Sequence, residues 1–112
     1  MAKYGGGFGG GMGNMQAILK QAQQMQQKMQ EAQEELAETE VTGDAGGGLV
    51  EVTMTCKKEV VDVSIKPEAV DLDDLEMLED LIVAAFNDAS AQADEEAKEV
   101  MAPFAGAMGG MF

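Results

Sequence analysis

The sequence predicts an α+β fold made of one helix, a three-stranded antiparallel β-meander and a second long helix. Three observations carry this prediction. A heptad repeat of apolar residues occupies residues 14–37, which favours a helix. Short runs in which apolar and polar residues alternate follow within residues 49–66, which favours strands. A second apolar periodicity of three and four residues occupies residues 71–102 and indicates another helix.

The first predicted helix carries a narrow apolar seam. Most of its other positions are Gln, Glu or Lys, which are good helix formers and poor core residues, and Asn14 is a suitable N-cap. A stripe this narrow is typical of a helix that pairs with another helix. From Asn14 to Ala37 the helix would be about 36 Å long. The seam residues are Met15, Ile18, Ala22, Met25, Met29, Ala32 and Leu36.

Three short strands are predicted between the helices. The first is expected at residues 38–44, where β-branched residues replace the helix formers. The glycines at 46–48 indicate a turn rather than a phosphate-binding loop, because a strand-like run and not a helix follows them. Residues 56–59 read as a tight hairpin connection, and Pro67 stops the third strand. The apolar sides of the second and third strands are formed by Val50, Val52 and Met54 and by Val61, Val63 and Ile65.

The second predicted helix runs from Asp71 to Ala102. Asp73 with Glu76 fits a capping box at its start, and Pro103 is expected to end it. Its apolar face is bulky at first and thins to alanine, which lets another backbone approach closely. The face consists of Leu75, Leu78, Ile82, Ala85, Phe86, Ala89, Ala93 and Ala97.

The predicted lengths of helix and sheet do not match, and this mismatch predicts a homodimer. A seven-residue strand spans about 23 Å, so the first helix, at about 36 Å, cannot lie wholly over its own sheet. A three-stranded sheet also leaves two open edges. Pairing two copies would cover the seam and the edges together, and we therefore expect a twofold homodimer whose helices extend past the body.

The composition of the two ends predicts tails on either side of one domain. Residues 1–13 and residues 103–112 are rich in Gly and Met, which is typical of flexible segments. A single α-β-β-β-α domain is then expected over residues 14–102. A core this small and without Trp gains stability by oligomerising.

The net charge of −14 is unevenly distributed. Residues 1–37 are neutral, residues 38–67 carry −3 and residues 68–112 carry −11, and every basic residue is a lysine. A polyanion could therefore approach only the first third of the chain without strong repulsion. No signal peptide and no apolar stretch of about 20 residues is visible, so we expect a cytoplasmic protein without a membrane partner. Cys56, the one cysteine, is expected as an exposed thiol at the hairpin tip.

Catalytic, metal and cofactor sites are not expected. The chain has no His, and neither Ser64 nor Ser90 lies in a nucleophile-elbow context. The acidic run that begins at Asp71 lacks the glycine and glutamate spacing of a calcium-binding loop. The ten Met could suggest copper(I), but Met25 and Met29 lie on the heptad seam, where Met is an ordinary apolar filler.

With the element order in place, the chain resembles the YbaB/EbfC family of small bacterial nucleoid-associated proteins. The most specific segments are EVTGDAGGGLV at residues 40–50 and AFNDA at residues 85–89. The similarity extends over most of residues 14–101. One local departure is Cys56, where similar proteins usually carry a hairpin glycine, and it puts the turn type in question but not the fold.

The resemblance implies a function as well as a fold. Family members are homodimers with paired helices that project like tweezer arms; they bind double-stranded DNA, associate with the nucleoid and influence its organisation and gene expression without cofactors or catalysis. Because phosphate contacts need cations, the expected DNA-binding residues here are Lys3, Lys20, Gln24, Gln27 and Lys28. The alternative is an acidic protein–protein interaction module with little or no direct DNA binding, which the charge of the last third favours.

Overall fold

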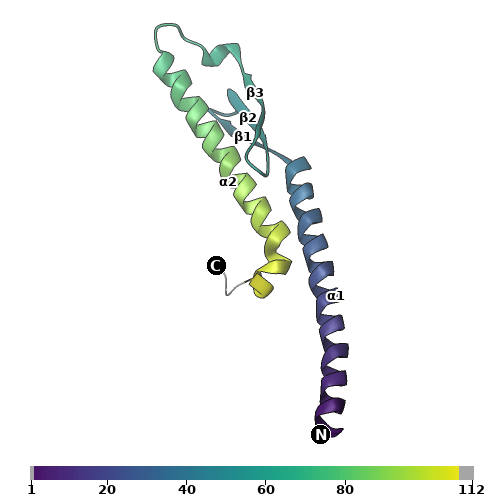
Figure 1. The fold of residues 1–112 in the computed structure, drawn as a ribbon. Coiled ribbons are helices and arrows are strands. Elements are labelled where there is room, and N and C mark those ends of the chain that lie inside the picture. The colour runs from purple at the N-terminus through teal and green to yellow at the C-terminus, as the bar shows by residue number, and fades with distance from the viewer. Residues whose placement is uncertain (1, 109–112) are drawn as a thin grey trace. The chain divides into compact units, whose positions relative to one another are not determined.

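A computed structural model describes the backbone of residues 2–108 and the side chains of residues 14–104, and it confirms the α+β fold (Figure 1). The three strands form one antiparallel sheet in the order β1-β2-β3. A short 3-10 helix, Pro67–Ala69, connects the sheet to the last helix. The other elements are α1 (Ala2–Glu38), β1 (Glu40–Ala45), β2 (Val50–Thr55), β3 (Val60–Ile65) and α2 (Leu75–Met108).

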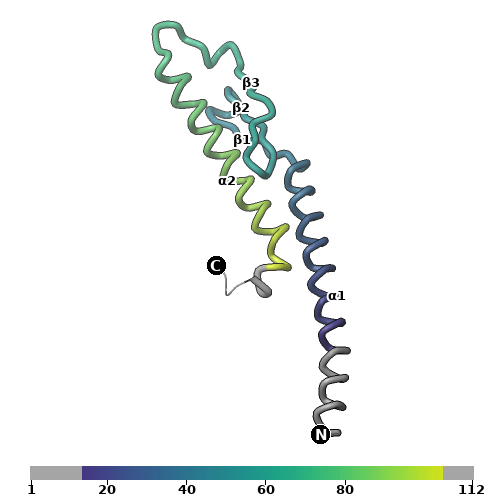
Figure 2. Tube along the Cα trace, in the orientation of Figure 1, coloured from purple at the N-terminus to yellow at the C-terminus, as the bar shows by residue number. Residues whose placement is uncertain are grey.

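The chain divides into two compact units, residues 1–31 and residues 32–112. The first unit is helical and contains most of α1. The second unit contains the last turns of α1, the sheet and α2 (Figure 2). The smaller unit carries the candidate binding residues of α1, and the larger unit carries the core.

Both helices are longer than the sequence analysis predicts. α1 begins at Ala2 rather than at Asn14, and α2 begins at Leu75 rather than at the predicted Asp71 and continues through Pro103 to Met108. Extending a helix is easier than nucleating one, so a strong helix can continue into neighbouring residues of low propensity. The assignment of residues 1–13 and 103–112 to tails stays a prediction, and residues 1 and 109–112 lie outside the described part of the chain.

The predicted turns are confirmed. All three glycines at 46–48 have positive φ angles, between 64° and 91°, which L-residues rarely adopt. In the hairpin between β2 and β3, the Lys58 N–H donates to Thr55 O at 2.8 Å. The β2–β3 pairing passes from Thr53 opposite Asp62 to Met54 opposite Val60, so Val61 is bulged out of the ladder. The prediction that Val61 lies on the apolar side of the third strand is therefore wrong, and Val60 takes that place opposite Met54.

The core lies between α2 and the first two strands. The alternating residues Val50, Val52 and Met54 of β2 are fully buried, as are the small residues Ala85, Ala89 and Ala93 of α2. Gly43 of β1 allows the closest approach, because a Cβ there would lie 2.5 Å from Ala85 O and closer still to Ala89 N. The thinning of the α2 face to alanine therefore does what the sequence predicts, and glycine on β1 completes the contact.

β3 is not covered in the same way. Its six residues are all exposed, although Val63 and Ile65 pair directly with the buried Val52 and Val50. Directly paired residues in an antiparallel ladder share a face. The face that α2 buries on β1 and β2 thus continues onto β3 without a covering element among the described residues.

The start of α2 corrects the predicted cap. Asp74, not Asp73, accepts the Met77 N–H at 3.3 Å, and Asp71 accepts the Asp73 N–H at 3.0 Å in the preceding turn. The proposed pairing of Asp73 with Glu76 is therefore wrong by one residue. The cause is local: Asp73 lies in a turn closed by Asp71, which moves the first helical turn one position along.

Cys56 also departs from expectation, because it is buried rather than exposed. Its N–H donates to Leu36 O at 3.1 Å and to Thr39 O at 2.9 Å, so the end of α1 lies against this turn. Burial raises the pKa of the Cys56 thiol, and the charge of Glu96 raises that pKa further.

Candidate nucleic-acid interface

The described residues proposed to bind DNA lie on one face of α1. At 100° per residue, Lys20, Gln24, Gln27 and Lys28 fall within an arc of about 100°, and all four are exposed. Lys3 belongs to the same helix, but its side chain lies outside the described residues. The face ends at Glu31, one turn after Lys28, where the charge becomes acidic.

The heptad seam lies on roughly the opposite face of α1, about 140° away by the same geometry. In the smaller unit the seam residues from Met15 to Met25 are exposed, Met15 and Ile18 at 62% each, and Met29 is half-buried. In the larger unit the last two seam residues, Ala32 and Leu36, are buried. Within residues 14–28, α1 thus presents a polar, lysine-bearing face and an exposed apolar seam.

Charge separates the two units more sharply than the sequence thirds suggest. Residues 14–31 contain two lysines and one glutamate, a net charge of +1. Residues 32–104 contain four lysines and twenty acidic residues, a net charge of −16. A polyanion is therefore repelled by the larger unit and not by the described part of the smaller one.

Two lysines of the larger unit are engaged with other side chains. Lys57 Nζ donates to Gln33 Oε1 at 3.2 Å, and Lys58 Nζ pairs with Asp94 Oδ1 at 2.8 Å. Both partners of the ion pair are about half exposed, which makes the pair a weak one. These contacts link the hairpin to Gln33 of α1 and to Asp94 of α2.

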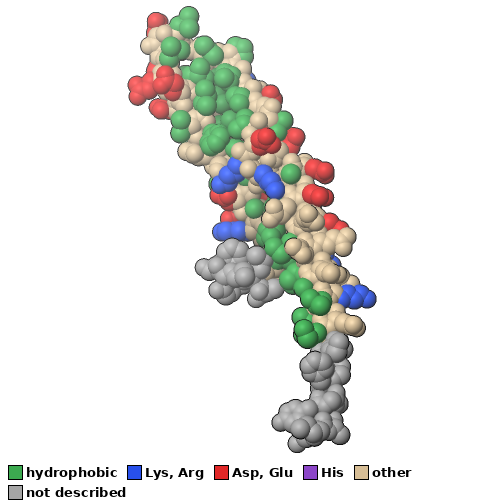
Figure 3. Space-filling model, viewed as in Figure 1, with side chains coloured by type: hydrophobic (Ala, Val, Ile, Leu, Met, Phe, Trp, Pro, Cys, Tyr) green, Lys and Arg blue, Asp and Glu red, His purple; other side chains and the backbone are tan. Residues whose placement is uncertain are grey.

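An apolar surface accompanies the uncovered strand. We call it the open β3 face: Val60, Val63 and Ile65 of β3 with Leu75 and Phe86 of α2. The β3 side chains lie on the α2 side of the sheet, and apolar side chains gather over this part of the larger unit in the space-filling view (Figure 3). The five side chains are each between 41% and 48% exposed. Exposed apolar patches of this kind are candidates for interaction surfaces.

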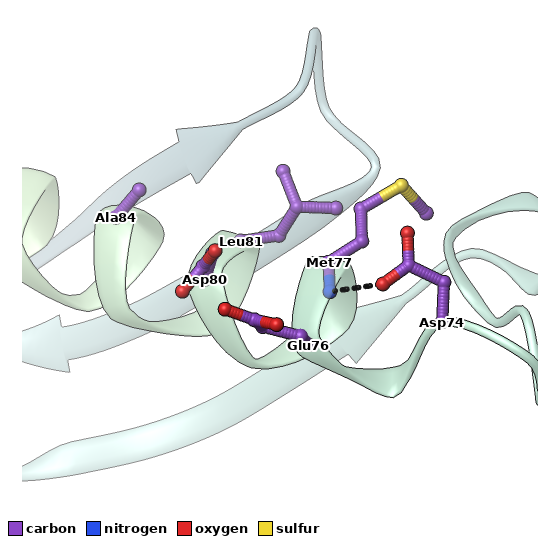
Figure 4. Close-up of a pocket in the computed structure, with 6 residues that line it drawn as sticks. All are labelled: Asp74, Glu76, Met77, Asp80, Leu81 and Ala84. Carbon is purple, nitrogen blue, oxygen red and sulfur yellow. Dashed lines mark hydrogen bonds between the residues drawn. The ribbon is translucent and has the colours of Figure 1, made fainter.

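An open pocket of about 530 Å³ lies beside the first turns of α2 (Figure 4). Asp74, Glu76 and Asp80 contribute carboxylates, and Met77, Leu81 and Ala84 complete the lining. One Asp74 oxygen already accepts the Met77 N–H. The pocket is acidic and therefore unsuited to a phosphate group, and no cluster of three metal-ligating residues occurs among the side chains described.

Two side chains of α2, Asp88 and Gln92, bind backbone groups of β1 and were not identified from the sequence. The available signal was their spacing of four residues on the flank of the apolar face.

None of the described helices is long and apolar enough to cross a membrane.

The sequence is similar to that of a known protein family and of several bacterial proteins. Residues 12–108 match the model of the YbaB/EbfC DNA-binding family. The chain is 56% identical over 76 residues to a nucleoid-associated protein of Lachnospira eligens, covering 68% of this chain and 66% of the relative. It is 59% identical over 64 residues to a nucleoid-associated protein of Staphylococcus aureus strain Newman, covering 57% and 61%. In each case the match spans slightly less than two thirds of the relative.

A solved structure confirms the architecture. The uncharacterized protein HP0035 from Helicobacter pylori superimposes with a TM-score of 0.67 at 24% identity, covering 78% of this chain and 91% of that one. Identity at this level speaks for the fold alone. The family match is the broader result, because it extends over both helices and the sheet, and its description names DNA binding rather than a reaction. The chain belongs to the YbaB/EbfC DNA-binding family.

Proposed function

We propose that this protein is a homodimeric nucleoid-associated protein that binds double-stranded DNA with little sequence selectivity and thereby influences nucleoid organisation and gene expression. The observation that carries the proposal is the family match over residues 12–108. The names of the relatives, nucleoid-associated proteins of two bacteria, support it.

The lysine-bearing face of α1 is the proposed contact with DNA. Lys20 and Lys28 would neutralise phosphates, and Gln24 and Gln27 would donate hydrogen bonds to phosphate or sugar oxygens. Lys3 would add a third cation from the start of the helix. The acidic larger unit would remain away from the duplex, because its net charge of −16 opposes contact.

Low sequence selectivity follows from the kinds of side chain on this face. The chain contains no arginine, the residue that most often reads guanine through a bidentate contact. A lysine ammonium is a point charge on a flexible stem, which suits phosphate binding better than base readout. The affinity for DNA should therefore come mainly from the release of counterions that the lysines displace from the phosphates.

Dimerisation would supply what one chain lacks. The exposed seam of α1 and the open β3 face are two apolar surfaces without a partner among the described residues. A second copy would cover such surfaces and double the number of lysines from Lys20 and Lys28 to four. With Lys3 included, six cations would face the DNA, which limits the slope of log K against log salt to about −5.

A salt-dependent DNA titration tests the proposed contact. Fluorescence anisotropy with a duplex of arbitrary sequence is measured from about 50 to about 200 mM salt. Replacing Lys20 and Lys28 with Gln should weaken binding about tenfold or more at the low end and flatten the slope by about 4. The matched control is Lys66→Gln with Lys98→Gln, which removes the same charge from the larger unit.

The control variant should bind DNA nearly as the unaltered protein does. Equal weakening by both double variants would show that net charge and not the α1 face sets affinity. No binding by the unaltered protein at low salt would remove the DNA-binding proposal altogether.

A second candidate function, an acidic module for basic protein partners, is favoured by the charge of −16 over residues 32–104. Capture of partners from lysate with and without nuclease separates the two functions. Partners that remain after nuclease treatment would support the module, whereas partners that disappear would be bridged by nucleic acid and would support DNA binding.

A further inference from the structure

Two side chains of α2 are bonded to the outer edge of β1. Asp88 Oδ2 accepts the Asp44 N–H at 3.0 Å, and Gln92 Nε2 donates to Thr42 O at 2.9 Å. Gln92 Nε2 also lies 3.3 Å from Asp88 Oδ2, which links the two side chains. We call Asp88 and Gln92 the edge clasp.

The backbone groups that the clasp occupies are those that point away from β2. In an antiparallel pair, alternate residues direct both backbone groups to the neighbouring strand and the intervening residues direct them outward. Thr42 faces Thr53, and their Oγ1 atoms are 3.1 Å apart, as in the closer, non-hydrogen-bonded type of pair. Thr42 and Asp44 therefore belong to the outward set that an added strand would need.

β3 presents the opposite situation at the other edge. In the part of the chain that the structure describes, no side chain is hydrogen-bonded to the backbone of residues 60–65. The flank of α2 that carries Phe86 is turned about 160° from Asp88. One flank of α2 is thus polar and closes β1, while the other is apolar and leaves β3 open.

We propose that the edge clasp closes β1 against strand addition, so that copies of this chain associate through β3 alone and assembly stops at a closed pair. The proposal rests on the proposed homodimer. Asp88 and Gln92 would thus block the β1 edge and leave only the β3 edge for a second copy. With both edges available, a three-stranded sheet would instead add copies without end.

Sedimentation velocity of the full chain over a range of concentrations tests the proposal. The double variant Asp88→Ala with Gln92→Ala should form species larger than those of the unaltered protein, in a fraction that rises with concentration. The control is Asp88→Asn, which keeps an oxygen that can accept the Asp44 N–H and should sediment as the unaltered protein does. Adding Thr42→Pro to the double variant should restore the original size, because proline blocks an edge without breaking the ladder to β2.

The outcomes separate the clasp from the dimer. The mass of the unaltered protein tests the dimer, and the change in mass on loss of the clasp tests the inference. A double variant that keeps its far-UV circular dichroism and its original mass overturns the inference, as does one whose large species persist with Thr42→Pro. If the double variant unfolds, Gln92→Ala alone is judged by the same criteria.

Discussion

The two edge strands of the sheet, β1 and β3, differ in their packing against α2 and in the hydrogen bonds that side chains make to their backbone. β1 packs against the small residues of α2 through Gly43 and has its outer backbone bonded by Asp88 and Gln92. Among the described residues β3 makes neither contact, and its apolar residues Val63 and Ile65 are exposed. The same face of the sheet is therefore buried at the β1 edge and exposed at the β3 edge, so the larger unit has one closed and one open edge.

Gly43 provides the strongest test of the closed side. Gly43→Ala would force a methyl group into the backbone of Ala85 and Ala89, so α2 would have to move off β1. We expect a loss of about 3 kcal/mol in the free energy of unfolding, or about 15 °C in Tm for a domain of this size. Thermal unfolding followed by circular dichroism measures both.

Gly47→Ala is the matched control for this prediction. Position 47 has open space around its Cβ direction and a φ of 67°, so the variant should lose only about 1 kcal/mol through backbone strain. Equal losses at the two positions would mean that close packing of β1 on α2 is not what holds this side together.

A smaller effect on stability is expected at Cys56, which follows β2 and is buried. Since the folded-state pKa of the thiol is raised, the folded protein holds its proton more tightly than the unfolded chain does. The stabilising contribution is complete below the unfolded-state pKa and is lost as the pH rises through the folded-state pKa. Urea unfolding between about pH 7 and about pH 10 should show this fall in stability.

Cys56→Ala supplies the reference for that pH series, because other groups also titrate in this range. The difference in unfolding free energy between the two proteins should shrink as the pH rises. A difference that grows with pH would contradict a buried, protonated thiol.

The periodicity of apolar residues was sufficient to predict the helices and strands, but it did not predict which strand faces another element would bury. The alternation in β2 predicted that Val50, Val52 and Met54 share a face, and α2 buries that face. An equal alternation in β3 says only that Val63 and Ile65 share a face, since it cannot show how far across the sheet α2 reaches. The helix ends extended beyond prediction because tail composition does not decide where a formed helix stops.

For the candidate site too, features within one helix were predictable from the sequence, whereas contacts between distant segments were not. A regular helix fixes its own faces, so the spacing of Lys20, Gln24 and Lys28 was enough to group them. Contacts between distant segments were beyond local reasoning, including Lys58 with Asp94 and the burial of Cys56 under the end of α1. Each joins residues whose separation in the sequence leaves no periodic signal.

If two copies of the chain meet at the open β3 face, a charge placed on that face should separate them, and sedimentation equilibrium of three proteins measures whether it does. Val63→Asp places a charge on the open β3 face, whereas Ser64→Asp places the same charge on the other face of the same strand. We expect the mass of two chains for the unaltered protein and for Ser64→Asp, and the mass of one chain for Val63→Asp. A two-chain mass for Val63→Asp, or a one-chain mass for the unaltered protein, would show that pairing does not depend on the open β3 face.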